Sequence, residues 1–397
     1  MGRIETKFKQ TEVGLIPVDW NFVELRNIAE VKTGNTPPTK DKDNYGDSFF
    51  FVSPADLGKQ KYITNTEKKL TTKGFSLSRQ FPVNSILFTC IGSTIGKSGI
   101  AKQFLTSNQQ INAILPNDGY ITDFIFYILD LLSDKIRSFA SEQAVPLINK
   151  TDFEATLIPI PPTKTEQTAI ANALSDADLY IESLEKLIDK KQKIKQGSLQ
   201  QLLKPKENWE VKKLGLVGEI ITGGTPSTNI QKYWNGNIPW ITPTDISTTK
   251  EIYNSQREIS CEGLNVIRKL PANTLLITCI ASIGKNAILK IAGACNQQIN
   301  AIIPNKNYNV DFLYYLFENS KNYLLGNAGI TATLMISKKD FSEIVFPLPS
   351  KTEQQQIAKT LCDIDSEINI LTQKLTKAKA IKQGMMQQLL TGKIRLI

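Results

Sequence analysis

Two long segments of the chain place apolar residues three and four positions apart, the spacing of a helix that packs along one narrow stripe. The first stripe contains Leu174, Ala177, Ile181, Leu184 and Ile188. The second contains Leu361, Ile364, Ile368, Leu371 and Leu375. Such stripes are typical of a coiled coil, so we expect these residues to form the seam between two paired helices.

Each segment opens with a capping-box sequence directly after proline. The first box is formed by Thr163 and Glu166, and the second by Ser350 and Glu353. In a capping box the hydroxyl accepts a hydrogen bond from a first-turn amide, and the glutamate bonds back to the cap. A helix from residue 170 to residue 203 would be roughly 50 Å long at 1.5 Å per residue.

The charges on the two segments indicate how the helices pair. Acidic residues such as Asp178 and Asp365 fall early in each segment, and lysines such as Lys195 and Lys382 fall late. Parallel helices would set like charges side by side, whereas antiparallel helices oppose acids and lysines. We therefore expect an antiparallel coiled coil, in which each exposed ion pair contributes only about 0.3–0.5 kcal/mol.

The stretches before the two helices also repeat each other. Thr-Gly-x-Thr-Pro occurs at 33–37 and 222–226, and Asn-Gln-Gln-Ile-Asn-Ala occurs at 108–113 and 296–301. These matches indicate an internal duplication. We expect a first domain at 1–162, its helix at 163–204, a second domain at 205–349 and its helix at 350–397.

Within each domain, short apolar runs bounded by turn residues predict β-strands, followed by one helix. The expected strands are 85–91, 99–104 and 111–115 in the first half, and 274–280, 286–291 and 299–303 in the second. The expected helices are 123–140 and 311–325. The predicted fold class is α+β, with two pseudo-symmetric mixed α/β domains separated by an antiparallel coiled coil of two long helices.

Composition narrows the possible functions. The 397 residues include five cysteines without a Cys-x-x-Cys pair, and no histidine. This argues against a zinc site and against an imidazole base, and we expect no metal or cofactor in this chain. The net charge of +9 favours a polyanionic partner such as nucleic acid. No apolar run is long enough for a membrane span, so we expect a cytoplasmic protein without a membrane partner.

Two sequences suggest catalysis but fit it poorly. Residues 91–98 resemble a phosphate-binding loop, yet its glycines are one residue too close and the second copy lacks the first glycine. We interpret this segment as a strand-to-strand turn. Asp56, Glu67 and Lys69 have the residue types of a metal-dependent nuclease site, but Gln256 stands where the second copy would need Glu67. We expect Asp56 and Asp245 to lie at turns and the chain to be non-catalytic.

Between the repeated motifs, the two halves differ at segments of nearly equal length. These are 40–44 against 229–233, 97–107 against 285–295, and 141–147 against 329–335. A shared scaffold with changed loops is what two readers of different DNA sequences would show. We expect phosphate contacts from Lys40, Lys42, Lys59, Lys97, Lys232, Lys250 and Lys285, and base contacts from Asn44, Ser93, Thr94, Asn229, Ser282 and Asn286.

The chain resembles the specificity subunit of type I restriction–modification enzymes. The resemblance rests on the Gly-x-Thr-Pro loops at 34–37 and 223–226 and on the Lys-Thr-Glu-Gln helix starts at 164–167 and 351–354, and it extends over nearly the whole chain. The departures are an additional proline, Pro162, and Pro205 at the end of the first copy.

This resemblance implies that each domain reads one half of a split, asymmetric site in double-stranded DNA, while the helices fix the spacing. It also implies that two adenine methyltransferase subunits dock on the helical region and that restriction subunits join them. S-adenosylmethionine, ATP and Mg would belong to those partners. The alternatives are a metal-dependent nuclease centred on Asp56, Glu67 and Lys69, and a coiled-coil adaptor that does not bind DNA.

Overall fold

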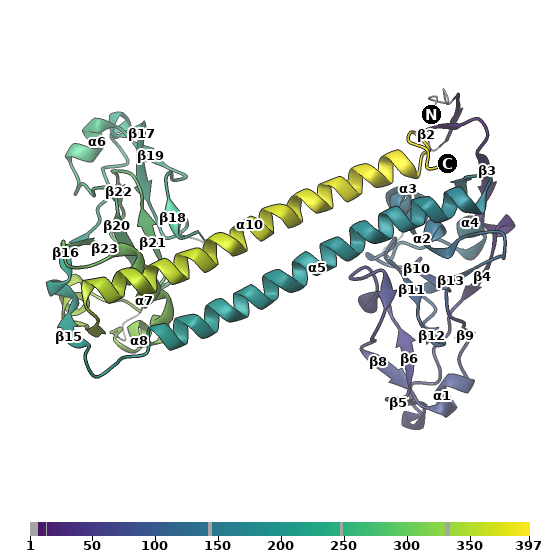
Figure 1. Cartoon of the computed structure of the whole chain (residues 1–397), viewed down its shortest axis with the longest axis horizontal. Helices are drawn as coiled ribbons and strands as arrows, with labels where there is room; N and C mark the ends of the chain where they lie inside the picture. The colour runs from purple at the N-terminus through teal and green to yellow at the C-terminus, as the bar shows by residue number, and fades with distance from the viewer. Residues whose placement is uncertain (1–6, 13, 142–144, 247–248, 330–333) are drawn as a thin grey trace. The chain divides into compact units, whose positions relative to one another are not determined.

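The structure is a computed structural model that describes residues 7–12, 14–141, 145–246, 249–329 and 334–397. The chain forms two compact units. Unit 1 comprises Met1–Leu184 and Lys374–Ile397, and unit 2 comprises Glu185–Gln373. Each unit therefore contains one globular domain and a part of both long helices (Figure 1).

The core of unit 1 is a five-stranded sheet. Its order is β4 (Ala29–Thr33), β13 (Ile111–Pro116), β10 (Ile86–Thr89), β11 (Ser98–Ala101) and β7 (Tyr62–Ile63). All neighbours are antiparallel except β11 and β7, which are parallel. Every residue of β10 and β11 is buried. Burial on both faces explains why β10 begins with the continuous apolar run Ile86–Phe88 rather than with alternating residues.

Unit 1 also contains smaller sheets. A second sheet has the order β5 (Tyr45–Gly46), β8 (Lys68–Leu70), β6 (Phe49–Val52), β12 (Leu105–Ser107) and β9 (Gln80–Phe81). Two further pairs join β1 (Phe8–Thr11) to β2 (Gly14–Pro17), and β3 (Asn21–Glu24) to β14 (Leu157–Ile160). Short helices α1 (Thr72–Ser76) and α4 (Lys150–Glu154) and 3-10 turns at Leu25–Asn27, Lys42–Asn44 and Pro54–Asp56 connect the strands.

Unit 2 repeats the central sheet with the same topology. Its order is β16 (Gly218–Thr222), β23 (Ile299–Pro304), β20 (Thr274–Thr278), β21 (Asn286–Leu289) and β18 (Glu251–Ile252). A smaller sheet joins β19 (Glu258–Ile259), β17 (Trp234–Ile241) and β22 (Ala294–Cys295), and β15 (Glu210–Lys213) pairs with β24 (Val345–Leu348). Short helices α6 (Cys261–Asn265) and α9 (Lys338–Glu343) and 3-10 turns at Leu214–Leu216 and Gln231–Tyr233 complete the unit.

The helix predicted in each domain is divided into two. Unit 1 has α2 (Thr122–Leu131) and α3 (Ser133–Arg137), and unit 2 has α7 (Val310–Asn319) and α8 (Lys321–Gly326). The breaks fall at Leu132 and Ser320, whose ψ angles of 3° and 18° leave the helical range. The prediction of one continuous helix per domain was therefore wrong.

The two long helices are α5 (Lys164–Leu202) and α10 (Lys351–Leu389), each of 39 residues. They run antiparallel in both units. In unit 1, Asp178 of α5 pairs with Lys382 of α10 at 2.6 Å. In unit 2, Lys195 of α5 pairs with Asp365 of α10 at 2.6 Å, and Lys191 pairs with Glu367. The predicted fold class, including the antiparallel direction, is confirmed.

The seam residues alternate with exposed positions along both helices. Leu174, Leu184 and Leu361 are buried, and the other predicted seam residues, Ala177, Ile181, Ile188, Ile364, Ile368, Leu371 and Leu375, are half-buried. Half-burial is what a two-helix seam gives, because two helices alone cannot enclose the residues between them. Both ends of the seam are covered further by the globular domains.

The start of each long helix departs from the predicted capping box. The hydroxyls accept hydrogen bonds from the first-turn amides, with Glu166 N to Thr163 Oγ1 at 3.2 Å and Glu353 N to Ser350 Oγ at 3.3 Å. The glutamate carboxylates, however, bind cations instead of returning to the caps. Glu166 pairs with Arg395 and Glu353 with Lys206. Only the hydroxyl half of the prediction was correct.

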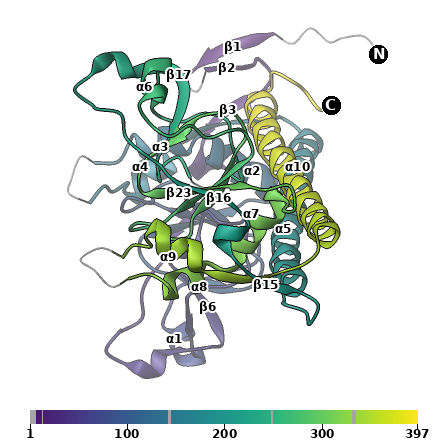
Figure 2. The ribbon, with the colours of Figure 1, turned by 90° about the vertical axis from the view of Figure 1, so that its left-hand side faces the viewer.

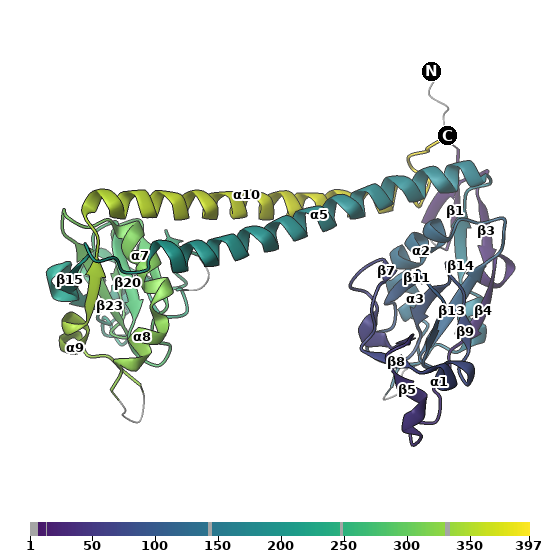
Figure 3. The same ribbon diagram turned by 60° about the horizontal axis from the view of Figure 1, so that its bottom comes forward.

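Each domain contacts its long helix through an equivalent tyrosine. In unit 1, α2 lies between the central sheet and α5 (Figure 3), and Tyr127 donates a hydrogen bond to Asp178 at 2.6 Å. In unit 2, α7 lies against α10 (Figure 2), and Tyr315 donates to Asp365 at 2.6 Å. These aspartates are the same ones that pair with lysines of the other helix, so each carboxylate joins a domain and both helices.

Candidate nucleic-acid interface

Three loops of unit 1 meet at one end of the central sheet because of the strand order. Strand β13 is antiparallel to both β10 and β4, so its beginning lies beside the ends of both neighbours. Ile111 pairs with Thr89, and Asn112 pairs with Thr33. The loops 34–44, 90–97 and 108–110 therefore lie together at what we call the loop edge.

Unit 2 builds an equivalent loop edge. There Ile299 pairs with Thr278, and Asn300 pairs with Thr222. The corresponding loops are 223–233, 279–285 and 296–298. Matching strand registers thus place matching loops at the same end of each sheet, although their side chains differ.

A hydrogen bond between side chains joins two of these loops in each unit. Thr36 Oγ1 donates to Gln109 Oε1 at 2.7 Å, and Thr225 Oγ1 donates to Gln297 Oε1 at 2.6 Å. The loops approach closely only because Gly34 has no side chain, since a Cβ there would lie 2.2 Å from Ser107 Oγ. The bond fixes each glutamine amide so that its NH2 group can donate elsewhere.

An arginine lies beside the first loop in both units. Arg79 donates to the carbonyl of Thr33, and Arg268 Nη1 donates to that of Thr222 at 2.7 Å. Both arginines are exposed. Among the residues that the structure describes, neither has a carboxylate at salt-bridge distance, which leaves each charge available to an anion. Sequence reasoning missed Arg79, Arg268, Gln109 and Gln297, although their equivalent positions in the two halves could have identified them.

The hairpin loop after β10 is a tight turn, as predicted for residues 91–98. Gly92 and Gly96 have φ angles of +93° and +99°, which favour glycine. Gly92 N donates to Pro146 O at 2.9 Å, and in unit 2 Ala281 N donates to Leu334 O at 3.0 Å. These bonds bring the third pair of variable segments to the loop edge. Parts of those segments, residues 142–144 and 330–333, lie outside the described residues.

Most of the predicted DNA contacts are on or next to the loop edge and accessible. In unit 1 the exposed or half-buried ones are Lys40, Lys42, Lys59, Ser93, Thr94 and Lys97, and in unit 2 they are Asn229, Lys232, Ser282 and Lys285. Lys97 lies across the backbone of Gly58, where a Cβ would be 3.0 Å from its Cγ.

Burial corrects the other three predictions. Asn44 is fully buried and donates to Pro38 O at 3.0 Å. Asn286 is 4% exposed and donates to Glu318 at 3.0 Å. The Lys250 ammonium is bound by Asp311 at 2.6 Å, with 16% of its side chain exposed. These three polar groups are thus mostly or fully covered and bound within the protein, which argues against contacts with DNA.

Asp56, the aspartate considered for a nuclease site, and its counterpart Asp245 have structural roles. Asp56 Oδ2 accepts from the amide of Ser53 at 2.8 Å and from its hydroxyl at 2.7 Å, while Oδ1 accepts from Glu67 N at 2.8 Å. Asp245 makes the equivalent bonds to Thr242 and Gln256. Each carboxylate therefore fastens a turn, as expected. No cluster of metal-binding side chains occurs among the described residues.

Buried thiols are also unsuited to nucleophilic chemistry. Burial raises the pKa of Cys90 to about 12 and that of Cys279 to about 11. Both sulfurs are in the core beside strand β10 or β20, where a thiolate would be poorly solvated.

In the described part of the chain, no helix is both long enough and apolar enough to cross a bilayer.

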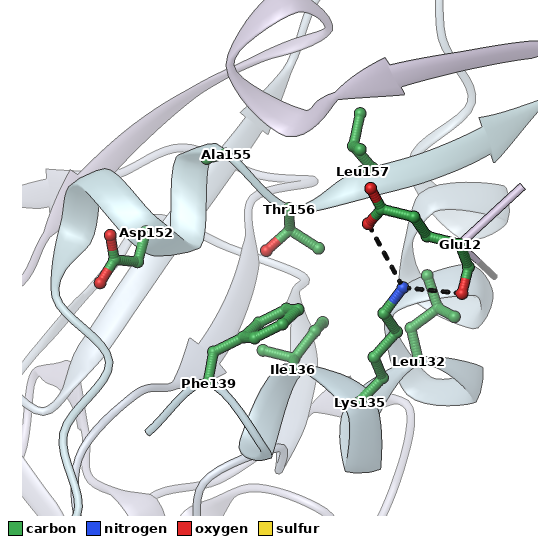
Figure 4. A pocket seen from close by; sticks show the side chains of 9 residues that line it. All are labelled: Glu12, Leu132, Lys135, Ile136, Phe139, Asp152, Ala155, Thr156 and Leu157. Carbon is green, nitrogen blue, oxygen red and sulfur yellow. Dashed lines mark hydrogen bonds and ion pairs between the residues drawn. The ribbon is translucent and has the colours of Figure 1, made fainter. Parts of the chain in front are cut away.

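Unit 1 also contains a cavity of about 390 Å³ (Figure 4). It is lined by apolar side chains of Leu132, Ile136 and Phe139 and by the pair of Glu12 and Lys135. Lys135 Nζ donates a hydrogen bond to Glu12 O at 3.0 Å. None of its lining residues belongs to the three loops of the loop edge.

Comparison with known proteins agrees with this architecture. The family model described as "Type I restriction modification DNA specificity domain" matches residues 17–196 and again residues 206–380. The chain is 29% identical to the putative type I restriction enzyme MjaX specificity subunit of Methanocaldococcus jannaschii, covering 99% of this chain and 97% of that protein. It is 34% identical to the EcoR124I/EcoR124II specificity subunit of Escherichia coli over 46% of this chain and 48% of that protein.

Solved structures share the fold. The S subunit of a type I restriction–modification system from M. genitalium superposes with a TM-score of 0.61 at 18% identity, covering 97% of this chain and 98% of that one. The HsdS subunit from Thermoanaerobacter tengcongensis gives a TM-score of 0.51 at 18% identity, covering 96% and 98%. The two matched specificity domains account for both globular domains and most of both long helices, and the chain therefore belongs to the family of type I restriction–modification DNA specificity subunits.

Proposed function

We propose that unit 1 and unit 2 each read one half of a bipartite, asymmetric site in double-stranded DNA. One observation carries this proposal: the same loop edge is built twice on matching strand registers, with different side chains exposed on it. Ser93 and Thr94, for example, correspond to a hairpin turn in unit 2 that carries Ala281 and Ser282. The strand framework shared by the two units would hold the loops in the same position on DNA, and the different loop side chains would recognise different base sequences.

The positive charge of the loops supports a DNA partner. Lys97 and Lys285 occupy equivalent, exposed positions beside the hairpin turns. Arg79 and Arg268 also occupy equivalent positions on the loop edge. Cations that recur in both halves cannot distinguish two different half-sites, so they suit phosphates, which both half-sites share.

The long helices would fix the spacing of the half-sites and bind the methyltransferase subunits. Several large apolar side chains on them are more than half exposed: Leu179 at 63%, Tyr180 at 53%, and Ile370 and Ile381 at 52% each. Apolar side chains left in water beyond the helix seam are typical of a surface that a partner covers. Two methyltransferase subunits would match the two copies of domain and helix in the chain, and restriction subunits would join that complex.

The chemistry would then belong to the partners. S-adenosylmethionine would be bound by the methyltransferase, and ATP and Mg by the restriction subunits. This chain would be a non-catalytic subunit of a cytoplasmic complex. The boundaries that we propose for its parts remain 1–162, 163–204, 205–349 and 350–397.

The decisive experiment maps methylated adenines in DNA modified by this chain together with its methyltransferase. We expect a single split motif with two different halves and a constant gap. Methylation of a continuous or palindromic motif would contradict the proposal of two unlike readers. If the chain binds methyltransferase but gives the complex no salt-sensitive DNA binding, it is an adaptor instead.

A further inference from the structure

Unit 2 holds an arginine against two tryptophans at its loop edge. The guanidinium carbon of Arg257 lies 4.0 Å from the ring centroid of Trp234 and 5.2 Å from that of Trp240. The two indoles pack edge to face, with centroids 5.1 Å apart and an interplanar angle of 88°. Stacking on an indole face leaves the N–H groups at the rim of a guanidinium free to bind an acceptor.

The two indoles are themselves anchored to the first loop of the loop edge. Trp234 Nε1 donates to Ser227 O at 3.1 Å, and Trp240 Nε1 donates to Gly224 O at 2.8 Å. Trp240 is 4% exposed, whereas Arg257 is exposed. The arginine therefore lies against two indoles that are anchored to the loop 223–233, and little side-chain freedom remains to be lost when it binds.

Arg257 also has no anionic partner. Among the described residues, no carboxylate lies at salt-bridge distance from its guanidinium. A stacked, uncompensated arginine presents a planar fork of donors that matches two acceptors side by side. On DNA, two such pairs of acceptors exist: O6 and N7 of guanine in the major groove, and the oxygens of a phosphate.

Unit 1 does not repeat this arrangement. Tyr45 and Phe51 replace the two tryptophans and keep an edge-to-face contact at 6.5 Å, with Tyr45 donating to Pro37 O at 3.1 Å. The position of Arg257 is occupied by Lys68, which pairs with Phe51 across the strands as Arg257 does with Trp240. The edge-to-face aromatic pair is thus retained in unit 1, whereas at this position the planar fork of donors is present in unit 2 alone.

This difference between the units indicates whether Arg257 binds guanine or a phosphate. A phosphate contact is needed equally by both half-sites, and the recurring Arg79 and Arg268 suit that role. A cation that changes from lysine to arginine, and that lies against the aromatic pair only as arginine, suits a feature that only one half-site has. The geometry points to Arg257 as a specificity-determining residue, whose guanidinium reads O6 and N7 of one guanine in the half-site bound by unit 2. This inference rests on the proposed function and names one nucleobase that unit 2 would recognise.

The test compares methylation motifs and DNA binding for the full chain in complex with its methyltransferase. The variants are Arg257→Ala and Arg257→Lys, the second of which keeps the charge and removes the planar fork. We expect both to relax one G·C position in one half of the motif, with discrimination at that position falling by about 5- to 150-fold. The other half of the motif should be unchanged.

Two matched variants serve as controls. Arg268→Ala removes the same charge from the same loop edge and should weaken binding to all sequences without changing the motif. Lys68→Ala should leave discrimination at that G·C position unchanged. Thermal unfolding of each complex checks that the variants remain folded. If Arg257→Ala does not fold, Arg257→Lys, which keeps a cation at this position, still tests the inference.

The outcomes are distinct. A uniform loss of affinity with an unchanged motif would assign Arg257 to a phosphate and overturn the inference. An unchanged motif and unchanged affinity would overturn it as well, as would a wild-type motif without a G·C pair in either half. If the wild-type complex yields no split motif at all, the proposed function fails, independently of Arg257.

Discussion

Arg395, close to the end of the chain, binds the carboxylate of Glu166 at the start of the first long helix, with Nη2 2.8 Å from Oε2. Glu166 is only 1% exposed. The same guanidinium binds Asp19 through two hydrogen bonds of 3.0 and 2.9 Å. One arginine therefore fastens the C-terminal segment to both the N-terminal region and helix α5 of unit 1.

The first prediction concerns this arginine. Arg395→Ala leaves the Glu166 carboxylate buried without a cation, and an unpaired buried charge costs about 3–5 kcal/mol. We expect a loss of unfolding free energy of about 3 kcal/mol, measured by urea denaturation of the full chain. Glu166→Gln added to Arg395→Ala should restore part of it, because the amide carries no charge.

Lys393→Ala provides the control for this experiment. Lys393 is exposed in the same C-terminal segment, so its removal should change the unfolding free energy by less than about 0.5 kcal/mol. Equal effects of the two substitutions would show that the Arg395 pair contributes no more than an ordinary surface charge.

A second prediction compares two ion pairs between the helices of unit 2. Lys195 and Asp365 are each 28% exposed, and Asp365 also accepts a hydrogen bond from Tyr315. Lys191 and Glu367 are 30% and 54% exposed. Because water screens the second pair more, we expect double-mutant cycles with alanine to give a coupling near 1 kcal/mol for Lys195 and Asp365, and about 0.3 kcal/mol for Lys191 and Glu367. A larger coupling energy for Lys191 and Glu367 would contradict the role of Asp365 in joining the domain to both helices.

A third prediction concerns Lys97 at the hairpin turn of unit 1. Its exposed ammonium suits a phosphate, so Lys97→Ala should lower affinity for all DNA sequences about equally. The slope of log K against log salt should become shallower by roughly 0.9, the value for one lost phosphate contact. Binding titrations of the methyltransferase complex at several salt concentrations measure both effects. Loss confined to one half-site would indicate a base contact instead.

Much of the architecture could be predicted because the chain contains an internal duplication, so that each pattern occurs in two copies. The apolar stripes and the distribution of Asp178, Lys382 and their counterparts decided both the existence and the direction of the helix pair. The strands β10 and β20 were identifiable as apolar runs. The break at Leu132 was not, because neither glycine nor proline marks it and the apolar pattern continues across it.

The candidate site was predicted less completely. Residue type suggested Asn44, Lys250 and Asn286 as DNA contacts, but a polar side chain does not reveal whether a neighbouring strand or acid covers it. Asp311, which binds Lys250, is far away in the sequence. Arg257 was missed for the opposite reason, since its aromatic support comes from β17 and becomes visible only when the strands are paired.

The last prediction follows from the buried thiols. Burial raises the pKa of Cys279 to about 11 from an ordinary value of 9.0. Between these values the unfolded chain releases a proton that the folded chain keeps, so the folded state binds more protons and its stability falls as pH rises. Cys279→Ala removes this contribution, and the fall in unfolding free energy should become shallower by up to about 1.4 kcal/mol per pH unit. Urea denaturation under reducing conditions between about pH 9 and 10.5 measures the slope. If Cys279→Ala has the same slope as the unsubstituted chain, the Cys279 thiol ionises as readily in the folded chain as in the unfolded one.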